Sequence, residues 1–279
     1  MIETRGLGIL AGGGLFPVKV AESAVRAGRP VHIVAISGEA DATIEAFPHT
    51  WIKLGEVGRI LKTLKKAECR ELVIIGSVTR PDLSQVRFDL GGILNLPTIL
   101  GLTIGGDDSL LSNVIRFFEA RGFEVRGAHE VAPELLAGSG PIGRNRPGDQ
   151  DIADIAKGWH VVEALGGLDV GQACVVARSH VLAIEAAEGT DRMLGRCGEL
   201  RQWGAKSFRR RRGVLVKCPK RGQELRVDMP AIGPRTIELV AAAGLSGVAV
   251  EASAVLIAER DRVAALADKL GVFVLGVER

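Results

Sequence analysis

The chain has 279 residues, 47% of them hydrophobic, and carries 36 basic and 33 acidic side chains for a net charge of +3. A chain of this length can bury a sizeable core, and its size favours two domains over one. The balanced charge argues against a dedicated nucleic-acid-binding protein, whose basic residues are usually in clear excess. No apolar run approaches the roughly 18 residues of a membrane span, and the four cysteines lack CxxC spacing. We therefore expect a soluble or peripheral protein of the reduced cytoplasm.

The first part of the chain predicts a βαβ unit. A buried strand at 7–11, a glycine loop, a helix at 17–27 and a second strand at 31–36 follow one another. The loop residues Gly12, Gly13 and Gly14 would let a ligand phosphate approach the backbone. AGGGLF lacks the third glycine of GxGxxG, so a dinucleotide fingerprint is weakly supported. A mononucleotide, a sugar nucleotide, or plain packing of helix on sheet stay open.

The next elements continue the alternation up to a linker. A helix is expected at 56–66 and a strand at 71–75, and Ser77 and Arg80 after that strand are candidates for contact with a phosphate or base. The apolar segment 89–103 resembles a lining, and the paired aspartates before a helix at 110–120 are better explained as caps than as metal ligands. After a strand at 123–126, the Gly- and Pro-rich stretch 133–147 predicts a domain boundary near residue 147.

The second half begins with a helix at 151–165 and a hairpin of strands at 173–177 and 181–184. Glu188 and Asp191 then flank Gly189 and Thr190 before a helix at 192–201. This turn is suited to holding a hydrated cation or to aiming a phosphate at helix N–H groups, although simple capping by Thr190 or Asp191 explains it too. The basic run 209–212 fits a solvated loop, or a contact with anionic lipid headgroups.

The densest chemistry lies between residues 213 and 236. A strand at 213–216 precedes Lys217 and Lys220, and Gly233 with Pro234 opens an amphipathic helix. The start of a helix beside two lysines predicts a phosphate site, and Asp228 in that neighbourhood would face a metal or activate water. A solvated turn aspartate is the plain alternative.

The remaining pattern predicts strands at 247–250, 254–257 and 272–275 and a helix at 260–270. Glu251, at the end of a strand, fits a hairpin glutamate or a second carboxylate of the site. The expected fold is α/β, with an N-terminal Rossmann-like parallel-sheet domain, 1–147, and a C-terminal mixed α/β domain, 148–279, that carries the catalytic aspartate.

The residues alone favour metal-assisted phosphoryl chemistry on a nucleotide-like substrate held between the domains. The chain has no Walker A loop, GxSxG elbow or HExxH motif. Two alternatives remain open. A nicotinamide-dependent oxidoreductase would need a better GxGxxG and an acidic residue about 20 residues on, for which 37–41 is only a loose candidate. A non-catalytic protein that binds a sugar nucleotide or lipid would need no role for Asp228.

Six segments in order resemble one known family. They are AGGGLFP at 11–17, GGDDSLL at 105–111, GFEVRGAHEVAPELL at 122–136, DVGQACVV at 169–176, EGTDRML at 188–194 and LVKCPKRGQELRVDMPAIGPRTIE at 215–238. Together they resemble the UDP-2,3-diacylglucosamine pyrophosphatases of lipid A biosynthesis, in the form unrelated to calcineurin-like phosphoesterases. The family stretch KPGQD differs here, because Arg221 and Glu224 replace its proline and acid, so Glu224 is left out of the expected site.

The resemblance implies magnesium-dependent hydrolysis of UDP-2,3-diacylglucosamine to UMP and 2,3-diacylglucosamine 1-phosphate, with water attacking the phosphorus nearer the sugar. It implies a cytoplasmic enzyme bound peripherally to the inner face of the inner membrane, with no nucleic-acid partner, and leaves open whether it forms a homodimer. The essential aspartate matches Asp228. The uridine end would meet the glycine loop, and apolar surfaces around 94–102 would take the acyl chains.

Residue types and resemblance together define the expected site. The catalytic residues are Asp228, Lys217 and Lys220; the substrate-binding residues are Gly12, Gly13, Gly14, Ser77, Arg80, Glu188, Gly189, Thr190, Gly233 and Thr236; and the magnesium ligands are Asp228, Asp191 and Glu188.

Overall fold

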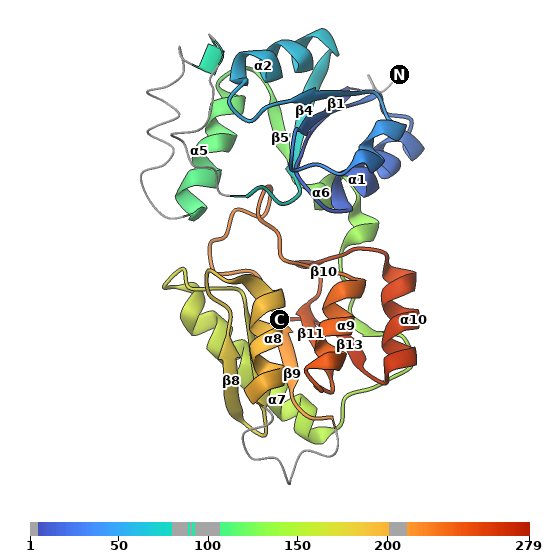
Figure 1. Ribbon diagram of the computed structural model, residues 1–279, viewed down its shortest axis with the longest axis vertical. Helices are drawn as coiled ribbons and strands as arrows, with labels where there is room; N and C mark the ends of the chain where they lie inside the picture. Colours follow the sequence, from blue (N-terminus) through green and yellow to red (C-terminus); the bar gives the residue numbers. More distant parts are fainter. Residues whose placement is uncertain (1–4, 80–88, 90, 93–106, 201–210) are drawn as a thin grey trace. The chain divides into compact units, whose positions relative to one another are not determined.

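The computed structural model describes residues 5–79, 89, 91–92, 107–200 and 211–279, without the side chains of 107–110 (Figure 1). The chain forms two compact units. The first unit comprises Met1–Glu134 together with Glu224–Asp228, and the second comprises Leu135–Gln223 and Met229–Arg279.

The first unit is built on a parallel sheet of five strands in the order β3-β2-β1-β4-β5. Its elements are β1 (Gly6–Ala11), α1 (Phe16–Arg26), β2 (Val31–Ile36), the 3-10 helix η1 (Ala42–Ala46), β3 (His49–Ile52), α2 (Val57–Lys66), β4 (Cys69–Ile75), α5 (Asp107–Glu119), β5 (Glu124–Arg126) and α6 (Ala128–Val131). A second 3-10 helix, η2 (Pro133–Leu135), follows at the border between the units.

Strand β1 lies at the centre of this sheet because both of its faces are apolar. Leu7 and Ile9 are fully buried, and the strand pairs with β2 on one side and β4 on the other. Helices α2 and α5 cover one face of the sheet, where Leu64 and Ile115 join the same core, and α1 and α6 cover the other (Figure 1). The strand order changes direction between β1 and β4, and ligands of such sheets bind beyond the carboxyl ends of strands at this kind of point.

The second unit is built on a mixed sheet of six strands in the order β6-β13-β11-β9-β7-β8, with a separate two-stranded sheet β10-β12. Its elements are β6 (Gly140–Ile142), α7 (Asp149–Gly166), β7 (Ala173–Ala177), β8 (His180–Ile184), α8 (Gly189–Leu200), β9 (Val214–Lys217), β10 (Ala231–Ile232), α9 (Pro234–Ala242), β11 (Gly247–Glu251), β12 (Leu256–Ile257), α10 (Arg260–Leu270) and β13 (Phe273–Val277).

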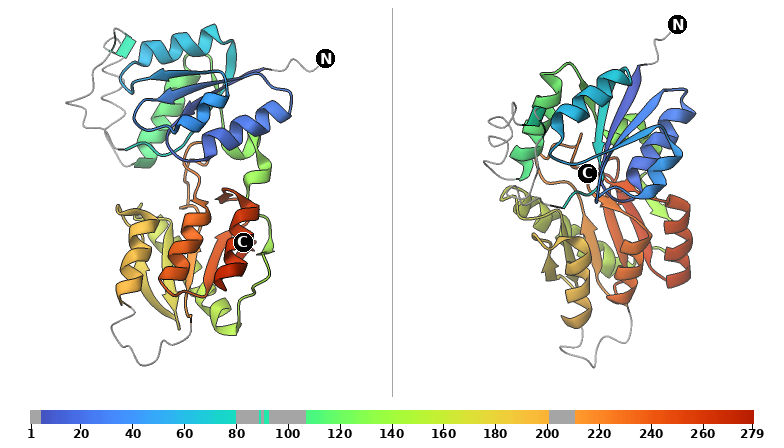
Figure 2. Two further views of the ribbon diagram at one scale, coloured as in Figure 1. Left: turned by 45° about the vertical axis from the view of Figure 1, so that its right-hand side comes forward. Right: turned by 45° about the horizontal axis from the view of Figure 1, so that its top comes forward.

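Helices form layers on both faces of the six-stranded sheet (Figures 1 and 2). On one face, Met193 of α8, Ile237 of α9 and Val263 of α10 pack into a core with alternate residues of the central strands. On the other face, Ile155 and Val162 of α7 pack against the remaining strand residues. Because both faces are covered, the central strands are apolar throughout, as expected for buried strands.

The expected α/β fold is confirmed, and most predicted helices and strands match the structure within a few residues. Three short strands were not expected: β3, β6 and β10. The hairpin interpretation of Glu251 was wrong, because both edges of β11 are taken by β9 and β13 and the following β12 pairs with β10. The units also divide earlier than residue 147, since β6 pairs with β13 and so belongs to the second unit. None of the helices in the described ranges has the length and hydropathy to span a membrane.

Candidate active site

In the first unit, the glycine loop packs tightly against the end of β4. Gly13 and Ser77 form an isolated antiparallel bridge, with hydrogen bonds of 2.7 and 3.0 Å between their backbones. A Cβ atom on Gly12 would lie 2.4 Å from the Ser77 carbonyl oxygen, so glycine is required there for close backbone approach. The predicted residues Gly12, Gly13 and Ser77 therefore do lie together, at the switch point of the sheet.

The amides of this loop already have acceptors. Gly12 N–H donates to the Ile75 carbonyl at 2.9 Å, Gly13 N–H to the Ser77 carbonyl, and Gly14 N–H to Asp41 Oδ2 at 2.7 Å. A phosphate would have to displace one of these acceptors to bind the loop backbone, and Asp41 would repel it. Packing of backbone on backbone thus accounts for much of the glycine content. Arg80 lies outside the described residues.

In the second unit, two predicted residues form a hydrogen-bonded group with a carboxylate that the sequence analysis did not select. Lys217, at the end of β9, donates from Nζ to Thr190 Oγ1 at 2.8 Å, and Thr190 Oγ1 donates to Glu185 Oε1 at 2.7 Å. Lys217 and Glu185 are each only 6% exposed. Glu185 follows β8 directly, and Gly189 and Thr190 form the first turn of α8. Lys217 and Thr190 are thus brought together as one hydrogen-bonded group.

A second helix begins beside this group. Gly233 precedes α9, and its N–H donates to the Thr236 hydroxyl at 3.3 Å across the first turn. Asp191 of α8 accepts from Arg235 Nε of α9 at 2.8 Å, which ties the amino-terminal turns of the two helices together. The starts of α8 and α9 thus lie side by side, and Thr190 in the first turn of α8 contacts the buried Lys217 ammonium; helix starts and cations are the groups that favour anions.

The predicted magnesium ligands in this unit are engaged with arginines. Asp191 pairs with Arg235, and Glu188 pairs with Arg196. The pKa of Glu188 is held below its usual value, foremost by its own backbone N–H and then by the Arg196 side chain. Among the described residues, no three His, Cys, Asp or Glu side chains gather into a group that could hold a metal ion. The magnesium role of Glu188 and Asp191 stays a prediction, in which a cation would have to replace these arginines.

The second predicted lysine organises a loop. Lys220 Nζ donates to Asp169 Oδ1, and the Lys220 N–H donates to Gln223 Oε1 at 2.7 Å. Gln223 is buried, and its Nε2 donates to Gln172 at 3.1 Å. These contacts fix the backbone that leads from β9 toward Asp228, so they give Lys220 a structural task in addition to any contact with substrate.

Asp228 lies in a short segment, Glu224–Asp228, that belongs to the first unit although its neighbours in sequence belong to the second. Val227 packs against the core of the first unit. Arg226 binds both oxygens of Glu224, at 2.9 and 2.7 Å, and Glu119 of α5 at 2.9 Å. The hydrogen bonds from Arg226 keep the pKa of Glu224 below its usual value. Asp228 is half-buried and its N–H donates to the Glu224 carbonyl at 2.9 Å.

Two of these residues were missed by sequence reasoning for different reasons. Glu185 stands in the apolar stretch after β8, and only the fold shows that Thr190 of α8 joins it to Lys217. Arg226 sits two residues from Asp228 and from Glu224, and its alternation with acids in ELRVD was a local signal that could have identified it.

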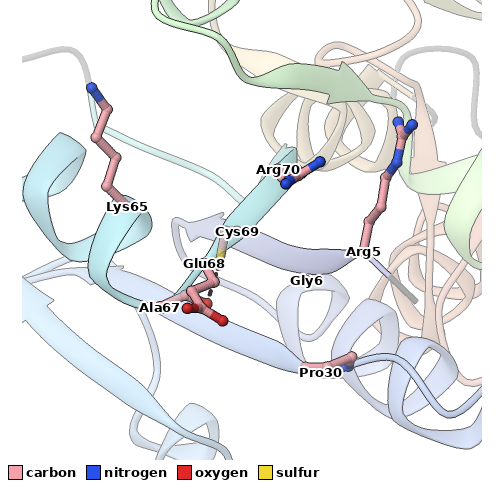
Figure 3. Close-up of a pocket in the computed structure, with 8 residues that line it drawn as sticks. All are labelled: Arg5, Gly6, Pro30, Lys65, Ala67, Glu68, Cys69 and Arg70. Atoms are coloured by element: carbon pink, nitrogen blue, oxygen red, sulfur yellow. Dashed lines mark hydrogen bonds between the residues drawn. The ribbon is translucent and has the colours of Figure 1, made fainter. Parts of the chain in front are cut away.

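The first unit also has a hollow, whose lining residues are drawn in Figure 3. This groove, with a volume of about 520 Å³, is at the amino ends of β1 and β4, the edge opposite the glycine loop. Its lining is Arg5, Gly6, Pro30, Lys65, Ala67, Glu68, Cys69 and Arg70. None of the predicted site residues contributes to it.

Comparison with known proteins covers both units. The family model of the LpxI N-terminal domain matches residues 6–135, and that of the LpxI C-terminal domain matches residues 138–275. The chain is 42% identical over 274 residues to the UDP-2,3-diacylglucosamine pyrophosphatase LpxI of Caulobacter vibrioides, covering 98% of each chain. With both domain models matched in order and a relative aligned from end to end, the chain belongs to the LpxI family.

Proposed function

We propose that this chain hydrolyses the pyrophosphate bond of UDP-2,3-diacylglucosamine, giving UMP and 2,3-diacylglucosamine 1-phosphate for lipid A biosynthesis. The observation that carries the proposal is the alignment over 98% of both chains with a relative that bears this activity in its name. The anion-binding arrangement around Lys217 supports it, because a pyrophosphate substrate brings charge to a site that offers a cation and two helix starts. A nicotinamide-dependent reaction has no comparable support.

In this proposal, the chemistry is a displacement at the phosphorus nearer the sugar. The oxygen of a water molecule forms a bond to that phosphorus, and the bridging P–O bond breaks with its electron pair leaving on UMP. Asp228 takes the proton that the attacking water loses. Lys217 neutralises charge that develops on the phosphoryl oxygens, and Lys220 and the start of α9 hold the leaving side. The glycine loop and Ser77 receive the uridine end.

A magnesium requirement is part of the same proposal and rests on the family resemblance. A bound divalent cation would neutralise phosphoryl charge. Asp228 remains the carboxylate assigned to it, since Glu188 and Asp191 are engaged with arginines. We further propose peripheral association with the inner face of the inner membrane, because the acyl chains of the substrate are anchored there.

The test is release of UMP from UDP-2,3-diacylglucosamine in the presence of magnesium or EDTA. Asp228→Ala is expected to reduce kcat by about a thousandfold or more while substrate still binds, because the variant removes the base and not the anion-binding groups. Asp149→Ala, an exposed residue of α7, is the matched control. With water labelled by ¹⁸O, the label is expected in the sugar phosphate. Absence of release from the intact chain would favour a non-catalytic sugar-nucleotide or lipid-binding protein.

A further inference from the structure

A buried cation and a buried carboxylate in the second unit are joined through a single hydroxyl. Lys217 and Glu185 are each 6% exposed, and Thr190 Oγ1 lies 2.8 Å from the ammonium and 2.7 Å from the carboxylate. The three side chains come from β9, the turn after β8 and the first turn of α8. These three elements, and the side chains they carry, come together only in the folded unit.

The direction of these hydrogen bonds is fixed by chemistry. An ammonium has donors only, so the Thr190 hydroxyl must accept from Lys217. The hydroxyl has one proton, which it gives to Glu185. Glu185 therefore holds the hydroxyl in the rotation that turns its lone pairs toward Lys217, and supplies the negative charge that a buried ammonium requires.

The Glu185 carboxylate is only partly hydrogen-bonded. Its second oxygen, Oε2, is buried and has no hydrogen-bond partner among the residues that the structure describes. Buried polar atoms without partners are rare because each costs free energy, so a carboxylate is a poor choice for filling this space. The negative charge of Glu185 can act only on a neighbouring group. That group is the Lys217 ammonium, which is hydrogen-bonded to Glu185 through Thr190.

We propose that Glu185 is a positioning residue for Lys217. Acting through Thr190, it holds the ammonium in place and aimed toward the phosphoryl oxygens, without itself touching the substrate. This inference rests on the proposed pyrophosphate hydrolysis for its catalytic consequence, but the hydrogen-bonded chain it describes can be tested without turnover.

The kinetic test compares Glu185→Gln, Thr190→Val and their double variant, using UDP-2,3-diacylglucosamine. Each single change is expected to lower kcat by about 10- to 100-fold, with a smaller change in KM, because an aimed cation acts most on transition-state charge. The double variant should be no worse than the more impaired single one, since the same chain of groups is already broken. Thr190→Ser, which keeps the hydroxyl, is expected to lose at least about tenfold less than Thr190→Val.

The matched control is Glu199→Gln, an exposed carboxylate on the same helix, α8, whose activity should be that of the parent. Fully additive losses in the double variant, or a serine variant as impaired as the valine variant, would overturn the positioning role. Thermal unfolding of each variant separates a loss of activity from a loss of fold.

A second readout needs no substrate. In ¹⁵N-lysine-labelled protein, the ammonium protons of Lys217 should be shielded from exchange with water and visible by NMR, and Lys217→Met identifies their signal. The signal should vanish in Glu185→Gln and Thr190→Val, and persist in Thr190→Ser and Glu199→Gln. An unchanged signal in all four variants would refute the positioning role even if hydrolysis is confirmed. The expected pattern in a chain that releases no UMP would refute the proposed function alone.

Discussion

A buried aspartate fixes the tight turn between β7 and β8. Asp154 of α7 is fully buried, and its carboxylate accepts from the backbone N–H groups of Arg178 and Ser179 at 2.9 and 2.7 Å. Both turn residues have positive φ angles, 52° and 63°, which non-glycine residues rarely adopt. The carboxylate thus compensates for the strain of this turn.

Removing this carboxylate should destabilise the second unit. Asp154→Ala leaves two backbone donors without their acceptor, and we expect a loss of roughly 1–3 kcal/mol in the free energy of unfolding. Urea denaturation measures the change, with Asp149→Ala, an exposed aspartate of the same helix, as the control. Equal stability of the two variants would show that water replaces the carboxylate at no cost.

The four cysteines should be unreactive in the folded protein. All four are buried, and burial raises the pKa of Cys174 and Cys218 to about 12 and that of Cys69 and Cys197 to about 11. Since the thiolate is the reactive form, alkylation at pH 8 should be slow by orders of magnitude compared with the urea-unfolded chain. Mass spectrometry after iodoacetamide treatment counts the modified thiols. Rapid labelling of the native chain would contradict the burial.

The raised pKa values of the folded-state thiols also predict a dependence of stability on pH. The free energy of unfolding should fall as the pH rises above about 8.5, the pKa of an unfolded thiol.

At the scale of elements, the segment Glu224–Asp228 depends on one guanidinium. Arg226 bonds to both oxygens of Glu224 and to Glu119 of α5, a planar geometry that lysine cannot reproduce. Arg226→Lys is therefore expected to lower kcat by about tenfold through displacement of Asp228, while KM changes little. Arg262→Lys, an exposed pair partner of Glu259, is the control. A loss confined to KM would place Arg226 in substrate binding instead.

The elements themselves were largely predictable from sequence, because their signals are local. The strand, glycine loop and helix from Gly6 to Arg26 follow from apolar runs and glycine, and α10 was predicted at its observed bounds. Strands of two or three residues, such as β6 and β10, carry too few side chains for a pattern, and their existence depends on a distant partner.

The site was predictable only where one local segment carries it. Lys217, Thr190 and the start of α9 were selected as candidates from their own neighbourhoods. The link from Lys217 to Glu185 depends on which strands and helices become neighbours. Hydrophobic periodicity predicts the elements but not their neighbours. For the same reason, a pattern could not show that Glu224–Asp228 belongs to the first unit.

At the scale of the whole molecule, the chain passes between the units three times, after residues 134, 223 and 228. The first unit is completed by a segment from the far half of the sequence, through Val227 in its core and Arg226 on Glu119. Cutting the chain once between the units should therefore not separate the fragments.

A specific protease site inserted after Ser139, an exposed residue, tests this. After cleavage, the two fragments should co-elute in size-exclusion chromatography and should separate only in denaturant. The double variant Arg226→Ala and Val227→Asp, cleaved in the same way, should release its fragments more readily, because the core and ion-pair contacts are lost. Spontaneous separation of the parent fragments would contradict the packing of this segment.

The pairing of β6 with β13 also determines when the second sheet can form during synthesis. Strand β6 is synthesised before the other strands of the six-stranded sheet, and its partner β13 is synthesised after them. The emerging polypeptide must therefore expose one unpaired edge of β11 until β13 has left the ribosome. Formation of the second sheet is thus a late, long-range event, and a chain without β13 would leave β6 unpaired and one edge of β11 open, and would therefore be prone to aggregate.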